Sequence, residues 1–351
     1  MKNLIRPFLV AIVLIAVVVG VLISADGTGK TDAVAERLPR IAIIQQASQS
    51  ALDEGVEGYI QGLAKHGYID GQTISVKRFN AQGDLATANN IARQATDGSY
   101  DMVITASTVS MQTVANANRQ GKVKHLFGLV ADPAGAGVGI NKDPLDHPAH
   151  LAGYGVFAPV DKAIKQALEF NPRMKKVGLV WHTAESNSKA YTVAARNACA
   201  ELGLELLEAN AEASQDVGEA ASSLVARGAD ALFITGDVVV LVAVDAVVAA
   251  GKRGGIPVFT VIPPNVKSGA LFDLGADYIA VGTEIGELAA EVLGGRDLRT
   301  VEVVNRAPAK FALNLKTLEF LGGKWRVPAE VAAKANLLID KDGEHVQPQS
   351  P

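Results

Sequence analysis

The stretch YDMVITASTVSMQTVANANRQGK, residues 100–122, shares its layout with ADALFITGDVVVLVAVDAVVAAGK, residues 229–252. Each has an Asp, an apolar run, a loop of small or hydroxyl residues, an Ala/Val-rich segment and a closing Gly-Lys. An apolar run followed by a helical pattern predicts one unit of a parallel sheet. The similarity of the two stretches predicts two copies of one α/β unit with a cleft between them.

The same alternation of strand and helix extends through most of the chain. Strands are predicted over residues 40–46, 73–79, 100–107, 124–130, 176–181, 204–210, 229–236 and 257–262. Helices between them are predicted to begin near Ala51, Leu85, Val109, Asn187, Val217 and Val239, and one more follows Pro159 and passes through Ala163 and Leu168. In a smaller C-terminal portion, a helix is predicted over 278–293, strands over 301–304 and 310–315, and short helices from Lys316 and Pro328. The fold class is therefore α/β, in two halves.

Composition excludes some classes of function. The formal net charge is −4, no basic run follows the N-terminus, and aromatic residues make up 5% of the chain, so nucleic acid is not expected as a partner. Cys199 is the only cysteine, which excludes an internal disulfide and a Cys-rich metal site. Residues 29–31 and 135–140 lack positions that phosphate-binding motifs require, so no cofactor is expected.

Residues 1–25 have the features of an export signal. Lys2 and Arg6 precede the 16 apolar residues 8–23, a length between that of a signal-peptide core and that of a membrane-spanning helix. A cleaved signal peptide and an uncleaved signal anchor both remain open. In either case the chain after Ala25 is expected to be periplasmic or otherwise extracytoplasmic, and an uncleaved segment would hold it at the inner membrane. Residues 26–39 are expected to be a linker.

The loops that follow five of the predicted strands are polar. They read IIQQASQS (43–50), ITASTVS (104–110), LVADPAG (129–135), WHTAESNS (181–188) and ITGDVVV (234–240). The carboxyl ends of parallel strands meet at one edge of a sheet, where loops and helix N-termini converge. Short hydrogen-bonding side chains at that edge are suited to a small polar ligand, particularly a carboxylate.

Catalytic chemistry is not indicated. His182, Glu185 and Ser188 share one loop, whereas the members of a nucleophilic triad usually come from separate loops, and no G-x-S-x-G occurs. His147 and His150 have a metal-like spacing but no third ligand nearby. We therefore expect no enzyme activity, no catalytic residues and no metal site.

Several segments together resemble a known family. They are residues 79–107, ADPAGAGV (131–138), AESNS (184–188), TGD (235–237) and residues 269–295. They look like the ABC transporter substrate-binding family that includes tryptophan- and tyrosine-binding receptors, over about residues 40–340. The resemblance implies a type I periplasmic-binding-protein fold, in which two Rossmann-like lobes with parallel sheets are joined by crossover segments and close on a ligand.

The resemblance also implies how the chain is divided and what it binds. Lobe 1 would comprise residues 40–156 and 277–305, lobe 2 residues 157–276 and 306–340, and residues 341–351 would form a tail. The protein would be a monomeric receptor that delivers a small-molecule ligand to an ABC permease in the inner membrane. A membrane-tethered ligand-sensing domain of the same fold is the alternative.

By position, the resemblance implies the following ligand-binding residues: Gln45, Gln46, Ser107, Thr108, Asp132, Glu185, Asn187, Ser188 and Asp237. Asp237 would pair with a ligand ammonium group or, alternatively, cap the next helix. The chain departs from the family pattern at Gln46, where an aromatic residue is usual, at Gln49 and Ser50, at Val238 and at residues 260–265. These departures weaken the case for an aromatic amino acid, so the ligand is expected to be an amino acid or a related carboxylate.

Overall fold

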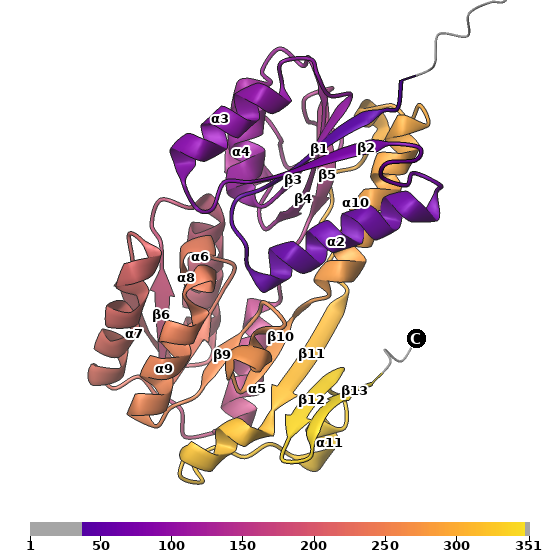
Figure 1. The fold of residues 1–351 in the computed structure, drawn as a ribbon. Coiled ribbons are helices and arrows are strands. Elements are labelled where there is room, and N and C mark those ends of the chain that lie inside the picture. Colours follow the sequence, from indigo (N-terminus) through magenta and orange to yellow (C-terminus); the bar gives the residue numbers. More distant parts are fainter. Residues whose placement is uncertain (1–36, 348–351) are drawn as a thin grey trace, which may run out of the picture. The chain divides into compact units, whose positions relative to one another are not determined.

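The computed structural model describes residues 37–347, and the strands form two sheets (Figure 1). The first sheet has five parallel strands in the order β2-β1-β3-β4-β5. These are β1 Arg40–Gln45, β2 Ser75–Asn80, β3 Met102–Ala106, β4 Lys124–Val130 and β5 Leu151–Gly155. In β1 and β3 nearly every residue is buried, which explains why they read as continuous apolar runs.

The second sheet has eight strands in the order β13-β12-β11-β10-β9-β8-β6-β7. They are β6 Lys176–Trp181, β7 Glu205–Asn210, β8 Ala231–Ile234, β9 Val258–Thr260, β10 Phe272–Ala276, β11 Ala309–Asn314, β12 Leu337–Asp340 and β13 Gly343–Val346. β6 to β10 are parallel, and β11 joins β10 in the antiparallel direction. The centre of this sheet is held by the stacked rings of Phe233, Phe259 and Phe272.

Helices connect the parallel strands. The α-helices are α2 Ser50–Lys65, α3 Leu85–Ala95, α4 Thr108–Ala117, α5 Val160–Phe170, α6 Ser186–Glu201, α7 Val217–Ala226, α8 Val238–Val242, α9 Val244–Gly254, α10 Tyr278–Leu293 and α11 Ala329–Ala332. Short 3₁₀ turns are η1 Ala134–Ala136, η2 Ser214–Asp216, η3 Asn265–Ser268, η4 Leu298–Thr300 and η5 Leu315–Phe320. No helix within residues 37–347 is both long enough and apolar enough to cross a membrane.

Helix α10 lies between β10 and β11 of the second sheet in sequence but packs beside α2, which follows β1 of the first sheet (Figure 1). Glycines make this crossing possible: a Cβ on Gly282 would lie 2.1 Å from the Gly55 carbonyl oxygen, and one on Gly62 would lie 2.2 Å from the Thr283 oxygen. The close approach of the two backbones places the first turns of α2 and α10 at one end of the same helix pair.

The structure confirms the α/β fold class with two sheets, and it corrects some elements. Residues 301–304 form no strand; Val303 N–H donates to the Pro144 carbonyl (2.9 Å) and the Val304 carbonyl accepts from Gly155 N–H (2.9 Å), so the segment is an extended connection. Strands β5, β10, β12 and β13 were not predicted; β5 (LAGYG) and β10 (FDLGA) are interrupted by Gly, and β13 (GEHV) is mostly exposed and polar. β13 lies within residues 341–351, which were expected to be a tail. The predicted signal segment, residues 1–25, lies outside the described residues.

Candidate functional site

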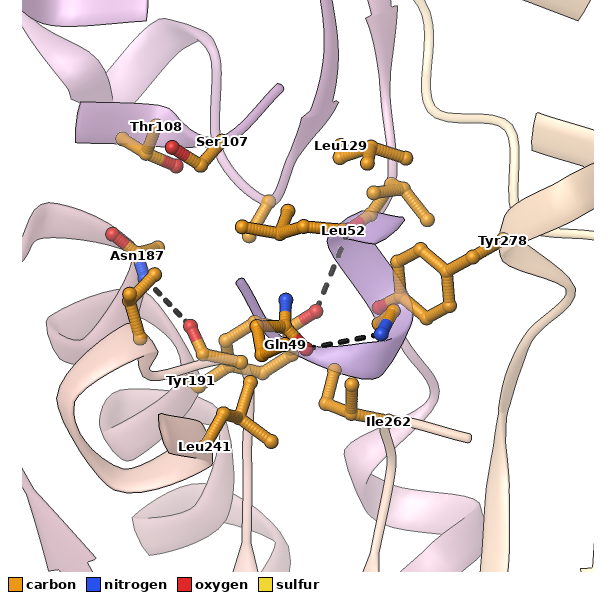
Figure 2. Close-up of a pocket in the computed structure, with 15 residues that line it drawn as sticks. Gln49, Leu52, Ser107, Thr108, Leu129, Asn187, Tyr191, Leu241, Ile262 and Tyr278 are labelled. Carbon is orange, nitrogen blue, oxygen red and sulfur yellow. Dashed lines mark hydrogen bonds between the residues drawn. The ribbon is translucent and has the colours of Figure 1, made fainter. Parts of the chain in front are cut away.

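A space of about 400 Å³, which is partly open to solvent, lies among the loops at the carboxyl ends of strands from both sheets (Figure 2). We call it the inner cavity. Its wall includes Gln49, Leu52, Ser107, Thr108, Leu129, Asn187, Tyr191, Val238, Leu241, Ile262 and Tyr278. Polar groups therefore occupy a few places in a largely apolar wall, as is usual for a small-molecule site.

Five helices begin at the inner cavity. The first turns of α2, α4, α6, α8 and α10 contribute Ala51, Thr108, Asn187, Val238 and Tyr278 to its wall. Each helix N-terminus carries unpaired N–H groups and a partial positive charge. Their convergence favours a ligand with a negatively charged group.

The residues that precede these helices differ in charge between the two sheets. Gln49 caps α2 by accepting from Ala51 N–H (3.0 Å), and Ser107 caps α4 by accepting from Ser110 N–H (3.2 Å); both caps are neutral. The residues at the corresponding positions before α6 and α8 are the acids Glu185 and Asp237. The positive end of α4 is thus left without an acid, whereas α2 has Asp53 in its first turn and Glu185 and Asp237 precede α6 and α8.

The N-terminus of α4 offers the clearest donors for an anion. The amide groups of Thr108 and Val109 donate to no other residue in the described part of the chain. Ser107, which precedes them, has φ of 111°, a conformation that costs energy for any residue other than glycine. Strain of this kind persists where the surroundings require it, and it concentrates at functional sites.

Two further residues share this unusual backbone conformation. Among residues 37–347, the non-glycine residues with positive φ are Gln82 (53°), Ser107 and Leu129 (57°). Ser107 and Leu129 line the inner cavity, and Gln82 lines a second, neighbouring space. All the non-glycine backbone strain of this kind is therefore located around these two spaces.

That second space, which we call the outer groove, is open to solvent and holds about 1470 Å³. Its wall includes Gln46, Gln82, Val109, Gln112, His182, Glu185, Glu212, Val238 and Val239. Val238 belongs to both walls, so the outer groove and the inner cavity are adjacent.

A buried network connects the loop after β6 with the loop after β8. Asp237 is fully buried, and its carboxylate accepts from Val240 N–H (3.0 Å), His182 N–H (2.6 Å) and the Ser188 hydroxyl (2.5 Å). Glu185 accepts from the Asn187 side chain (2.9 Å) and from Val238 N–H (3.2 Å). Burial, together with the neighbouring Asp237 carboxylate, raises the pKa of Glu185 above its usual value.

Asn187 leaves one hydrogen-bonding atom unused. Its Nδ2 donates to Glu185 and to the Gly236 carbonyl (2.6 Å), which directs the amide oxygen away from both. That oxygen, Oδ1, is buried and has no hydrogen-bond partner among the described residues. A buried acceptor without a partner costs free energy, so a donor group on a ligand in the inner cavity would stabilise it.

The residues implied by the resemblance fall into three groups. Ser107, Thr108 and Asn187 line the inner cavity, and Gln46 and Glu185 line the outer groove. The others line neither space: Gln45, Asp132, Ser188 and Asp237. Gln45 donates to Asp53 Oδ1 (2.5 Å), and Asp132 accepts from Gly135 N–H (2.9 Å), so both side chains hold their own loops.

Several wall residues were not predicted. Tyr278 starts α10, and it follows β10, a strand that the sequence pattern did not reveal. Tyr191 lies one turn beyond the polar loop; its ring stacks on Phe157 at 4.5 Å and its hydroxyl accepts from Ala158 N–H (3.1 Å). Their place in the sequence could have predicted them. Leu52, Tyr191 and Tyr278 all lie in or near the first two turns of helices that follow polar loops.

The geometry of His182 does not fit a nucleophilic triad. Its Nδ1 lies 3.0 Å from the Ala211 carbonyl oxygen, and the Ser188 hydroxyl donates to Asp237 instead of to His182. A triad requires the base to bond the nucleophile. The arrangement is that of a binding site, with donors and acceptors fixed around a mostly apolar space.

Comparison with known proteins agrees with this geometry. Residues 40–336 match the sequence model of a family described as ABC transporter substrate binding protein. A tyrosine-binding protein from Clostridioides difficile (strain R20291) is 29% identical over 293 residues, which are 83% of this chain and 83% of that protein. The solved structure of a conserved domain protein from Vibrio cholerae is 26% identical and has a TM-score of 0.80. The match covers 86% of this chain and 100% of that chain. An ABC domain from Streptococcus pneumonia in complex with L-Trp also has a TM-score of 0.80, at 21% identity, with 86% of this chain and 100% of that chain covered.

Proposed function

The chain belongs to the ABC transporter substrate-binding protein family, and from this premise we propose that it is the extracytoplasmic receptor of an ABC importer for an amino acid or a related carboxylate. The ligand would lie in the inner cavity, and the permease in the inner membrane would receive it. Lys2 and Arg6 before residues 8–23 support export of the chain, by a signal peptide or a signal anchor.

The observation that carries the proposal is the pairing of opposite groups around the inner cavity. On one side, at the positive end of α4, the amides of Thr108 in the wall of the inner cavity and of Val109 in the wall of the adjacent outer groove are free donors, suited to a carboxylate. On the other side, Asn187 Oδ1 is a free acceptor next to the acid Glu185, suited to an ammonium group. A zwitterion such as an α-amino acid satisfies both sides at once.

The relatives support an amino acid as the class of ligand. One is named a tyrosine-binding protein, and one solved structure contains L-Trp. The apolar part of the inner cavity, with Leu52, Leu129, Leu241 and Ile262, can accept a hydrocarbon side chain. Gln46, in place of an aromatic residue, still argues that the side chain differs from that of tyrosine or tryptophan.

We propose that binding closes the two lobes, which would comprise residues 40–156 with 277–305 and residues 157–276 with 306–340. The polar contacts between the two proposed lobes include a hydrogen bond from Gln112 Nε2 to Ser186 Oγ (3.4 Å) and an ion pair between Lys310 Nζ and Glu54 Oε2 (3.8 Å). Both contacts are long, so the ligand would supply much of the free energy of closure. The receptor would act as a monomer.

Calorimetric titration of the full chain with L-α-amino acids tests the proposal. Thr108→Pro removes one amide donor at the first position of α4, where proline is tolerated. It should weaken binding about tenfold or more, because a hydrogen bond to a charged group is lost. Thr108→Ala, which keeps the amide, is the control and should bind within about threefold of the unaltered chain. The absence of binding by every amino acid would contradict the proposal.

A further inference from the structure

The outer groove contains hydrogen-bonding groups that the fold does not use. Gln46 is 5% exposed, and its side chain forms no hydrogen bond to any residue in the described range; its Oε1 is buried without a partner. Such a side chain amide is costly to leave unpaired in a protein wall. Gln46 follows β1 of the first sheet, so this unused group lies on the first-sheet side of the groove.

An acid lies in the wall of the same groove on the second-sheet side. Glu185 is 8% exposed; only its Oε2 has hydrogen-bond partners among the described residues, and the buried carboxylate of Asp237 lies behind it. The wall also contains Glu212, and its only basic side chain is His182, with no Lys or Arg. A buried carboxylate without a cationic partner is unfavourable, so this wall favours a positively charged guest.

A metal ion is not that guest. No group of three His, Cys, Asp or Glu side chains between residues 37 and 347 could hold one. The wall of the outer groove also contains the apolar side chains of Val109, Val238 and Val239, and Val238 lines the inner cavity as well. A ligand whose cationic group is carried by a hydrocarbon chain fits this groove, because the chain can contact the valines and the cation can pair with Glu185.

We propose that the outer groove is a second subsite, which receives a positively charged group on the side chain of the bound amino acid. This inference rests on the proposed function, because it takes the α-carboxylate to lie at Thr108 and the α-ammonium at Asn187. The methylene groups then pass Val238, and the terminal cation reaches Glu185 from one sheet and Gln46 from the other. The ligand class is a basic amino acid, with an ammonium or guanidinium group at the end of an aliphatic side chain.

The test compares matched pairs of ligands on the full chain by calorimetry. L-Lysine is paired with L-norleucine, which lacks the terminal ammonium, and L-arginine with L-citrulline, which lacks the charge. The charged member of at least one pair should bind about tenfold more tightly than its neutral counterpart, as expected for a cation that pairs with a buried carboxylate. Glu185→Gln should reduce this preference to about threefold or less. Because Glu185 also holds the Asn187 side chain, the affinity for both members is expected to fall, and the ratio of the two affinities is the quantity that tests the subsite.

Two further variants make the result specific. Gln46→Leu should also reduce the preference for the charged ligand, which gives an independent answer if Glu185→Gln does not fold. Glu205→Gln, at a 57% exposed side chain on β7, should leave the preference unchanged. Melting temperatures establish that each variant is folded.

Each contrary result has a separate meaning. Equal binding of the charged and neutral members would reject the second subsite but would leave the proposed function standing. A preference for the charged member that survives both Glu185→Gln and Gln46→Leu would also reject the outer groove as the site. The failure of every amino acid to bind would reject the proposed function and this inference with it.

Discussion

The Ser188 hydroxyl donates a 2.5 Å hydrogen bond to the Asp237 carboxylate, and both side chains are fully buried. The bond joins the loop WHTAESNS after β6 to the TGD turn after β8. Since Asp237 also accepts from the His182 and Val240 amides, its carboxylate holds two neighbouring loops and the start of α8 in place. Asn187 belongs to the first of these loops and lines the inner cavity, and its Nδ2 donates to the Gly236 carbonyl in the second (2.6 Å).

Asp237→Ala should lower the free energy of unfolding by about 2–3 kcal/mol, because it removes a helix cap and leaves buried donors unpaired. Urea denaturation measures the change. Asp245→Ala, at an exposed position in α9, is the control and should change it by less than about 0.5 kcal/mol. A direct role in pairing with a ligand ammonium would be supported instead if Asp237→Asn kept full stability and lost amino-acid affinity.

Ser107→Gly should stabilise the fold by about 1 kcal/mol, since relief of the strained φ outweighs the few tenths lost with the cap. Ser107→Ala keeps the strain and loses the cap, so it should destabilise the fold by about 1 kcal/mol. Thermal and urea unfolding measure both variants. Ser107→Gly should also bind amino acids more weakly, because glycine loosens the start of α4. Destabilisation by Ser107→Gly would show that the conformation at residue 107 carries no strain.

Gly282→Ala should destabilise the protein by about 3 kcal/mol, because the added Cβ would meet the Gly55 carbonyl oxygen at 2.1 Å and force α2 and α10 apart. Gly218→Ala in α7 is the matched control: its Cβ would meet only Ala246 Cβ at 3.4 Å, so the helix should accept it. Denaturant unfolding measures the free energy of unfolding of both variants. Equal stability of the two variants would mean that the glycine crossing is not needed for the packing.

Asp273 makes stability depend on pH. It is fully buried and accepts from the Thr260 hydroxyl and Val266 N–H, both at 2.8 Å, and burial raises its pKa to about 7 from 3.8. The folded state therefore keeps this proton to higher pH than the unfolded state does. The contribution of Asp273 to stability is greatest below pH 3.8 and falls as the pH rises towards about 7.

Asp273→Asn isolates this contribution. The free energy of unfolding of the unaltered chain, minus that of Asp273→Asn, should decrease between about pH 4 and pH 7 and then become constant. Other titrating groups, including Glu185, are common to both proteins and cancel in the difference. A difference that stays constant over this range would show that Asp273 is ionised throughout.

Much of the fold was predictable because its strands are either apolar runs or alternate regularly with helices. β1, β3 and β8 are buried and apolar, so their positions follow from hydrophobicity alone. β5 (LAGYG) and β10 (FDLGA) are interrupted by Gly, and β10 also by Asp, so neither reads as a continuous apolar run. The extended segment 301–304 reads as a strand because Val favours that conformation, yet its hydrogen bonds go to two separate places, the Pro144 carbonyl in a loop and Gly155 N–H at the end of β5.

The binding site was predictable in place but not in detail. Polar loops after strands located Ser107, Thr108 and Asn187, which do line the inner cavity. The same pattern could not distinguish a side chain that faces the ligand from one that holds its own loop, as Asp132 and Asp237 do. Asp is both a good helix cap and a good ammonium partner, so only the hydrogen bonds in the structure separate the two roles.

The position of a bound amino acid tests the central claim most directly. A crystal structure of the chain with the amino acid that binds it best should place the carboxylate about 3 Å from the amide nitrogens of Thr108 and Val109, with the ammonium group hydrogen-bonded to Asn187 Oδ1. An amino acid that binds in solution but lies elsewhere, with its carboxylate away from α4, would contradict the account.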